Sequence, residues 1–243
     1  MLQRILITVF VVGALASCAA PEPTPAPTAA PKATQLPAAT AAPKATTAPA
    51  LTTPATGAQP TGDSVKFVLV AGKSEARYRV REQLAGVNLP SDAIGVTKDV
   101  SGEIIGKADG SVVKEQSKFR VDLNTLRSDR DQRDNFLRRS TLETNRYRYA
   151  DFTARAIKGL AIPPPRSGEV AFQLIGDLTI KNVTKEVVWD VKGKIEGEEF
   201  TGIATTSFKF GYFNIEIPRV QSVLSIEDNI KLELDFVIRY QPG

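Results

Sequence analysis

The side chains that carry most enzyme chemistry are almost absent from this 243-residue chain, which has no histidine and one cysteine, Cys18. Without histidine, neither the Ser-His-Asp nor the Cys-His arrangement for nucleophilic catalysis can form. An ordinary zinc site is not expected either, because its usual ligands are histidine and cysteine. The sequence also lacks a phosphate-binding glycine loop. We therefore expect no metal and no cofactor.

Carboxylates are the remaining groups with catalytic potential, because a pair of Asp or Glu side chains can hydrolyse a glycosidic bond. An exported glycan-cleaving enzyme is therefore one reading of the chain. Acidic side chains on the outward faces of strands would give the same pattern without a catalytic role. The candidate residues are Asp177, Asp190, Glu216 and Glu227.

Three further carboxylates, Asp129, Asp131 and Asp134, are close enough in sequence to be compared with a calcium site. The stretch lacks the glycine and the terminal glutamate of a calcium loop. Arginines also stand between these aspartates and would repel a cation. We therefore expect no calcium at this position.

The one cysteine follows a segment typical of exported proteins. Arg4 supplies a positive charge, and residues 5–14 are apolar but too few to span a bilayer. The tetrapeptide LASC at residues 15–18 resembles the lipobox of bacterial lipoproteins. This resemblance implies that residues 1–17 are a signal peptide and that Cys18 carries a diacylglyceryl lipid with acyl chains such as palmitate. We therefore expect an extracytoplasmic protein of the cell envelope, for example of the periplasm, anchored to the membrane at Cys18.

Residues 18–62 form a low-complexity segment of proline, alanine and threonine, with ten of the sixteen prolines of the chain. The segment has almost no large apolar side chains, so it cannot offset its conformational entropy by burying surface. We expect a disordered tether that reaches on the order of 100 Å when extended as polyproline II.

The composition changes at Asp63, where Val, Ile, Leu and Phe begin to alternate with charged residues. Residues 63–243 are enough for one domain with a sizeable core. The net charge of the chain is only +4, and basic residues are interspersed with acidic ones. This balance does not favour a nucleic-acid partner.

Most of the domain alternates with a period of two, as strands with one buried face do. In residues 230–240 every even position is apolar or aromatic, and the odd positions are charged apart from Val237. Eight or nine such segments, separated by turn signals, predict an all-β fold. Closure into an antiparallel barrel would remove the exposed edges of these long strands. A barrel of about eight strands has an interior wide enough for one slim ligand.

Residues 128–139 break the alternation and predict one short inserted helix. Aspartate and arginine stand four residues apart in three pairs, a spacing that stabilises helices. Phe136 and Leu137 give this helix an apolar edge that can dock on the barrel. The arginines of residues 127–155 would either meet an anionic head group or pair with the aspartates. The three pairs are Asp129–Arg133, Arg130–Asp134 and Asp134–Arg138.

Three segments of the domain carry a family resemblance. In residues 121–152 a strand ending in Val-Asp-Leu leads through a Ser/Thr turn into the Asp/Arg helix and then to an aromatic strand. Residues 176–191 contain Gly-Asp-Leu-Thr-Ile, a short turn and a hydrophobic strand, and residues 210–212 contain an aromatic-Gly step before the last strand. Together these segments resemble the YceI-like family of extracytoplasmic lipid-binding proteins. The resemblance is looser over residues 63–113, where the family's usual first-strand histidine is missing.

The resemblance implies a lipocalin-like barrel with an elongated apolar pore that holds a polyisoprenoid chain or a related amphiphile. We therefore expect a non-enzymatic protein that sequesters or transports such a lipid, with the polar end of the ligand near residues 127–152. Phe136 and Leu137 would then act as a lid. The same inward side chains could instead fill a solid core, so an envelope interaction module without a ligand stays open. The residues expected to line the pore are Phe119, Val121, Leu123, Phe136, Leu137, Phe152, Phe172, Leu174, Val187, Trp189, Phe208, Leu234 and Phe236.

Overall fold

The computed structural model describes residues 64–242. The signal peptide expected at residues 1–17, the lipidation site at Cys18 and the tether expected at residues 18–62 lie outside this range. The described chain consists of antiparallel strands, short turns and one short helix. No helix within it is long and apolar enough to cross a membrane. The all-β fold with one inserted helix is therefore confirmed.

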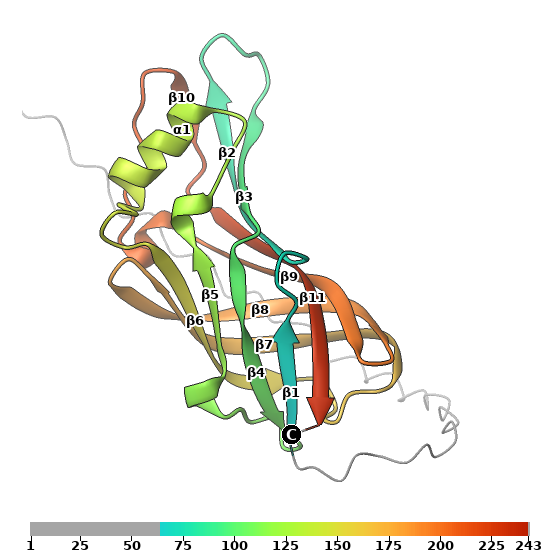
Figure 1. Ribbon diagram of the computed structural model, residues 1–243. Coiled ribbons are helices and arrows are strands. Elements are labelled where there is room, and N and C mark those ends of the chain that lie inside the picture. The colour runs from blue at the N-terminus through green and yellow to red at the C-terminus, as the bar shows by residue number, and fades with distance from the viewer. Residues whose placement is uncertain (1–63, 243) are drawn as a thin grey trace, which may run out of the picture. The chain divides into compact units, whose positions relative to one another are not determined.

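Eight strands close into an antiparallel barrel, in the order β1-β4-β5-β6-β7-β8-β9-β11 (Figure 1). The barrel closes where β11 pairs with β1, so that Tyr240 lies opposite Phe67. Closure leaves these strands without an exposed edge, and it confirms the prediction of about eight strands. The barrel strands are β1 (Ser64–Leu69), β4 (Val100–Lys107), β5 (Lys118–Asp122), β6 (Tyr149–Lys158), β7 (Ser167–Ile180), β8 (Val183–Glu196), β9 (Glu199–Phe208) and β11 (Ile230–Pro242).

Three further strands extend the wall beyond one end of the barrel: β2 (Glu75–Leu84), β3 (Ser91–Thr97) and β10 (Val223–Ile226). β11 pairs with β1 through residues 238–242 and with β2 through residues 231–235, so β1 and β2 follow one another along β11. β3 pairs with one edge of β2, and β10 pairs with the other edge near its end. The β2–β3 hairpin therefore rises above the barrel mouth.

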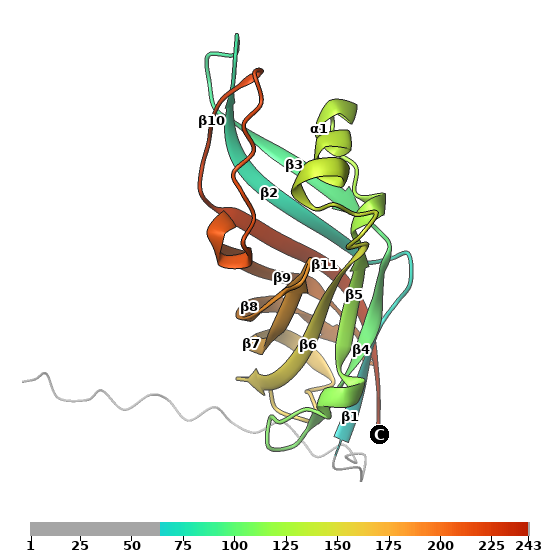
Figure 2. The same cartoon turned by 90° about the vertical axis from the view of Figure 1, so that its left-hand side faces the viewer.

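The helix α1 (Asp131–Phe136) continues into a π-helical turn, η3 (Leu137–Thr141). Both lie at the same end of the barrel as the β2–β3 hairpin and β10 (Figures 1 and 2). We call this end the cap; it comprises residues 80–93, α1 with η3, and residues 217–226. Short 3₁₀ turns complete the fold: η1 (Lys114–Gln116), η2 (Leu123–Thr125) and η4 (Phe210–Phe213).

The helix begins at Asp131, later than the predicted Ser128, because Ser128 is hydrogen-bonded to the side chain of Asp134. Its backbone N–H and its hydroxyl both donate to the carboxylate of Asp134, at 3.0 and 2.7 Å to Oδ1. Asp134 is therefore occupied by Ser128 instead of by the arginines expected from the sequence. The ion pair predicted between Asp129 and Arg133 is present.

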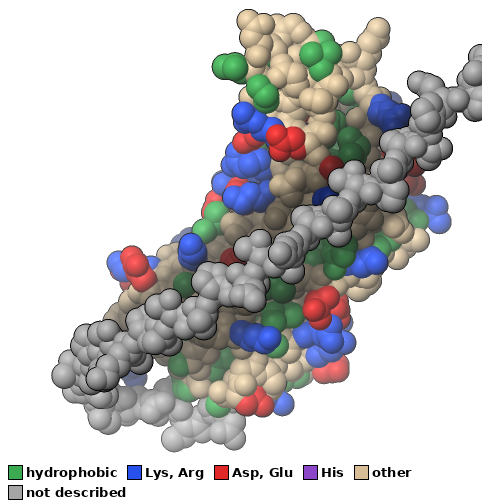
Figure 3. All heavy atoms as spheres, turned by 180° about the vertical axis from the view of Figure 1, so that it is seen from behind, with side chains coloured by type: hydrophobic (Ala, Val, Ile, Leu, Met, Phe, Trp, Pro, Cys, Tyr) green, Lys and Arg blue, Asp and Glu red, His purple; other side chains and the backbone are tan. Residues whose placement is uncertain are grey.

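The barrel interior is packed with large apolar side chains at its lower end, away from the cap. The rings of Phe200 and Phe236 meet at 4.7 Å between centroids. Glycines make room for them: Gly193 and Gly202 face each other on β8 and β9, and a Cβ on Gly202 would lie 2.9 Å from the Phe236 ring. Charged side chains of both signs lie on the outer face of the molecule (Figure 3).

Candidate functional site

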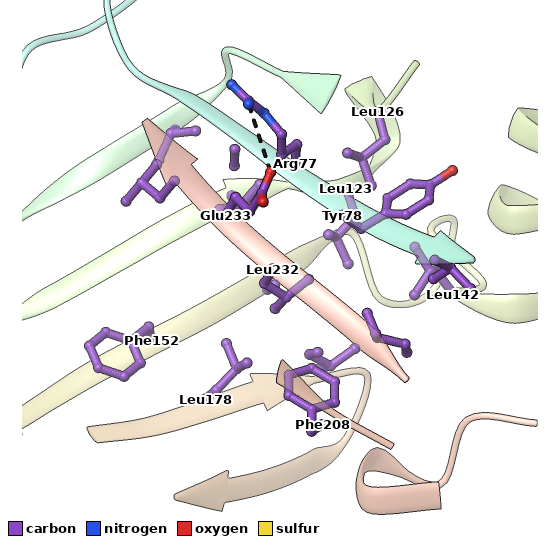
Figure 4. A pocket seen from close by; sticks show the side chains of 18 of the residues that line it. Arg77, Tyr78, Leu123, Leu126, Leu142, Phe152, Leu178, Phe208, Leu232 and Glu233 are labelled. Carbon is purple, nitrogen blue, oxygen red and sulfur yellow. Dashed lines mark ion pairs between the residues drawn. The ribbon is translucent and has the colours of Figure 1, made fainter. Parts of the chain in front are cut away.

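The barrel and the cap enclose a cavity of about 480 Å³. Small-molecule binding sites commonly have volumes of roughly 300–1,000 Å³. Aromatic and aliphatic side chains make up most of the wall, among them Phe152, Leu178 and Phe208 from the barrel and Leu142 from the segment after η3 (Figure 4). The inward faces of the strands therefore do not fill the barrel completely.

The residues that the sequence analysis assigned to a pore lie in the wall of this cavity, with the single exception of Val187. They come from β5, β6, β7, β8, β9, β11 and the 3₁₀ turn η2, and two of them, Phe136 and Leu137, come from the cap. The closed barrel thus brings together side chains that are more than a hundred residues apart in sequence. The lining residues assigned from the sequence are Phe119, Val121, Leu123, Phe136, Leu137, Phe152, Phe172, Leu174, Trp189, Phe208, Leu234 and Phe236.

Val187 is buried, but it does not contribute to the cavity wall. Its partner on β7 is Gly176, which has no side chain to cover the inner face of the sheet. The Phe152 ring occupies that space, since a Cβ on Gly176 would lie 2.5 Å from it. Val187 therefore packs in the wall behind the aromatic ring, which a period-two pattern does not reveal.

Sequence reasoning missed the contribution of the β2–β3 hairpin and of the segment before β10. On β2, the inward residues Ala76, Tyr78, Val80, Glu82 and Leu84 all line the cavity. Their alternation with charged residues could have identified the inward face of this strand, although Glu82 interrupts the apolar face. The segment before β10 has no alternation, so nothing in its sequence indicates that it lines a cavity.

The cavity opens in the cap. Among its lining residues, Arg130, Gln132 and Ser222 are the exposed ones. Arg130 and Gln132 lie at the start of α1, and Ser222 lies just before β10. α1 and β10 stand on opposite sides of the cap in Figure 2. The mouth of the cavity therefore lies between the start of α1 and the segment before β10.

A buried ion pair crosses the cap. Arg133 of α1 donates to Glu82 of β2, and their side chains are only 14% and 6% exposed. Arg133 also pairs with Asp129. Burial opposes the charged form of Arg133, but Asp129 and Glu82 outweigh this effect, so the pKa of Arg133 is raised. The ion pair ties the hairpin to the helix.

Four buried polar side-chain atoms have no hydrogen-bond partner within residues 64–242: Arg77 Nε, the Tyr78 hydroxyl, Thr141 Oγ1 and Trp189 Nε1. All four belong to residues that line the cavity. Native proteins leave few such groups unpaired. Burial raises the pKa of the Tyr78 hydroxyl, which therefore remains a proton donor. The atoms of Tyr78, Thr141 and Trp189 are available to a molecule bound in the cavity, whereas the Arg77 guanidinium pairs with Glu233 and Asp235.

The carboxylates considered for glycan cleavage lie outside the cavity wall. Asp177 pairs with Arg155 at 3.3 Å, Asp190 accepts a bond of 3.0 Å from Gln173, and Glu216 and Glu227 are exposed. The acidic residues that do line the cavity, Glu82 and Glu233, each pair with arginine.

No group of three or more Asp, Glu, His or Cys side chains in the described part of the chain is placed to hold a metal ion. Of the aspartates compared with a calcium site, Asp129 pairs with Arg130 and Arg133, and Asp134 is bonded to Ser128. Their oxygens are therefore committed to arginine and serine.

Comparison with known proteins finds solved structures of similar fold. Similar solved structures include BcnA of Burkholderia cenocepacia, with 18% identity over 70% of this chain and 98% of that one, and a TM-score of 0.52. A polyisoprenoid binding domain from Saccharophagus degradans, implicated in plant cell wall breakdown, has 15% identity over 73% and 98%, with a TM-score of 0.53. A mutant YceI protein of Campylobacter jejuni has 18% identity over 66% and 91%, with a TM-score of 0.50.

At such identities these structures support the fold alone. No curated protein sequence matches the chain. The sequence profile of the YceI-like domain, however, matches residues 67–238, which span the barrel and the cap almost completely. This chain therefore belongs to the YceI-like domain family.

Proposed function

We propose that this protein is an extracytoplasmic lipoprotein that binds an isoprenoid-like or other long apolar lipid in the cavity, for sequestration or transport. The observation that carries the proposal is the apolar cavity of about 480 Å³ inside the closed barrel. An apolar chain gains about 25 cal/mol for each Å² of surface that it removes from water. This gain is about 4 kcal/mol for a five-carbon unit, at about 0.8 kcal/mol per CH₂, before the cost of ordering the chain.

The polar atoms of the wall orient the ligand. The Tyr78 hydroxyl lies close to the charges of Arg133 and Glu82, which act on its pKa, and Thr141 is the last residue of η3. The polar end of an amphiphile fits at this cap end, where it meets donors without protein partners. The tail then lies lower in the barrel, against Phe152 and Leu174.

A protein of similar fold supports the same function, and the two alternative functions fit the site less well. The Saccharophagus degradans domain of the same fold is a polyisoprenoid binding domain. An interaction module without a ligand needs no cavity, and a glycan-cleaving enzyme needs paired carboxylates in its cleft. The candidate acids lie outside the cavity instead. The apolar segment and the LASC tetrapeptide before the tether support lipid anchoring at Cys18 and a place beside the membrane.

Native mass spectrometry tests the proposal. The full chain with Cys18→Ser, purified without detergent from its own host cells, is expected to carry an apolar molecule that organic solvent removes. The stripped protein is expected to rebind long-chain prenyl lipid and to change the emission of Trp189, the one tryptophan of the chain. A protein that arrives empty and rebinds no such lipid would rule the proposal out.

A further inference from the structure

The cap exposes an unusual share of the large apolar side chains of the molecule. Seven such side chains are exposed within residues 64–242, and four of them are in the cap. Leu89 and Leu224 are the most exposed of all, at 74% and 69%. We call the four cap residues the apolar tip. They are Val87, Leu89, Ile217 and Leu224.

The two segments that carry the apolar tip lie side by side. The backbone N–H of Ala85 donates to the carbonyl of Ser222 at 3.0 Å, and Val223 pairs with Leu84. The turn of the β2–β3 hairpin and residues 217–226, which include β10, therefore form one surface at the far end of the cap. Figure 3 shows a few separate hydrophobic side chains at this end of the molecule.

The same surface carries almost no charge. Residues 83–90 and 217–226 contain no Asp, Glu or Lys, whereas 24% of the residues of the whole chain are charged. The one charged residue in these segments is Arg219, which is exposed and has no carboxylate partner within residues 64–242. Acidic groups are repelled by anionic lipid head groups, and arginine is attracted to them. The composition of the tip therefore suits the surface of an anionic bilayer.

The apolar tip also adjoins the mouth of the cavity. Ser222 is both exposed and part of the cavity wall, and Leu224 follows it by two residues. Val223, between them, lines the cavity as well. A long lipid that enters at this mouth would otherwise expose its chain to water at about 25 cal/mol per Å². Contact of the tip with a bilayer removes that exposure.

We propose that the apolar tip inserts into the surface of an anionic lipid bilayer, and that the cavity exchanges its ligand through the mouth against that surface. Amphipathic elements that lie at such interfaces bury their apolar side roughly 5–10 Å deep. The exchange step rests on the proposed lipid-binding function, whereas insertion of the tip does not.

Site-specific labelling tests the insertion. The full chain with Cys18→Ser carries an environment-sensitive fluorophore at Leu89→Cys, and a matched chain carries it at Val188→Cys. Val188 is also exposed, at 40%, but lies on the outer wall of β8. Vesicles of phosphatidylcholine with phosphatidylglycerol are expected to shift the Leu89 emission to the blue and to leave the Val188 emission unchanged.

Three results would overturn the insertion. The first is any result in which the shift at Leu89 does not exceed the shift at Val188. The second is a shift without vesicles that grows with protein concentration, which means that the tip contacts a second copy. The third is a shift that appears only with protein-containing native membranes, which means that the partner is a protein.

Transfer kinetics test the exchange step. Leu89→Asp with Leu224→Asp is expected to slow the passage of a fluorescent prenyl lipid from the protein to anionic vesicles by at least about tenfold, because the apolar contact is lost. The equilibrium amount of bound lipid is expected to stay the same, and Val188→Asp is the control. An unchanged rate overturns the exchange step. If the parent protein binds no prenyl lipid, the proposed function fails, and the labelling experiment still decides the insertion.

Discussion

Arg133 on α1 forms a buried ion pair with Glu82 on β2, although 51 positions separate the two residues in sequence. The pair joins two elements that share no backbone hydrogen bond. It also stands above the apolar cavity that these elements help to enclose. The pair is therefore part of what holds the cap on the barrel.

Removal of one partner of this pair should destabilise the protein more than removal of both. Arg133→Met leaves the Glu82 carboxylate buried without its partner, and such changes cost roughly 3–5 kcal/mol. The double variant Glu82→Leu with Arg133→Met should recover most of that loss. Urea unfolding of the four proteins in the cycle measures the difference. A loss in the double variant equal to the sum of the two single losses would show that the pair is not coupled.

Enlarging a residue of the cavity wall should displace the ligand. Leu174→Trp places an indole ring in the cavity beside Trp189, its partner on the adjacent strand β8, and should abolish lipid retention in native mass spectrometry. Because space is present, the loss of stability should stay below the 1–3 kcal/mol that is typical of overpacking. Val187→Leu is the control, since Val187 packs outside the cavity: it should lose stability but keep the lipid. If Leu174→Trp kept the lipid and Val187→Leu lost it, the ligand would lie outside this cavity.

The hydroxyl of Tyr78 should select ligands that carry an oxygen acceptor, because it is buried without a hydrogen-bond partner at the cap end of the cavity. Tyr78→Phe keeps an aromatic wall but removes the one donor of that side chain. A net hydrogen bond contributes about 0.5–1.5 kcal/mol, so the variant should bind prenyl alcohols or ketones about two- to tenfold more weakly. Binding of the matching hydrocarbon should not change. Competition measured by native mass spectrometry compares the two lipids, and equal losses for both would mean that Tyr78 contributes only packing.

Acid should weaken the fold partly through Glu233. Burial opposes ionisation of this carboxyl, but Lys231 and Arg79 more than compensate, so its pKa lies below the ordinary value of 4.5. A lowered pKa stabilises the folded state above about pH 4.5, and this stabilisation is lost as the pH falls through the folded-state pKa. Glu233→Gln should therefore lose less stability than the parent between about pH 5 and pH 3. Thermal unfolding of both proteins across this pH range measures the difference. If their unfolding temperatures fell in parallel with pH, Glu233 would not contribute to the loss of stability in acid.

Membrane attachment should depend on Cys18. Two acyl chains on this residue anchor a protein stably, at about 0.8 kcal/mol per buried CH₂, whereas a single chain binds only marginally. Cys18→Ser should move the protein from the membrane fraction to the soluble fraction of lysed cells. The apolar tip alone is a weaker contact, and carbonate washing should remove it. A variant that stays in the membrane after such a wash would argue against lipidation at Cys18.

The sequence by itself was sufficient for the class of fold. Period-two alternation depends only on which side chains prefer water, and it located strands such as β11 to within two residues. The loss of that alternation located the helix, although its start was placed too early. The error arises because Ser128, which was expected to begin the helix, is hydrogen-bonded to Asp134 instead. Serine and aspartate can each hydrogen-bond to several neighbouring groups, so the sequence alone does not determine the first residue of the helix.

Tertiary structure alone decided that a cavity exists and where its mouth lies. Inward residues look alike in sequence whether they fill the barrel or leave a cavity. The width of the barrel interior depends on the number of strands and on their stagger, which local sequence does not show. The ring of Phe152 over Gly176, which removes Val187 from the wall, is a contact between strands. The ion pair of Glu82 with Arg133 and the contacts of Ser222 and Val223 with Ala85 and Leu84 likewise follow from pairing between distant segments. Local patterns encode the preference of each face for water, whereas the distances between faces arise only on closure.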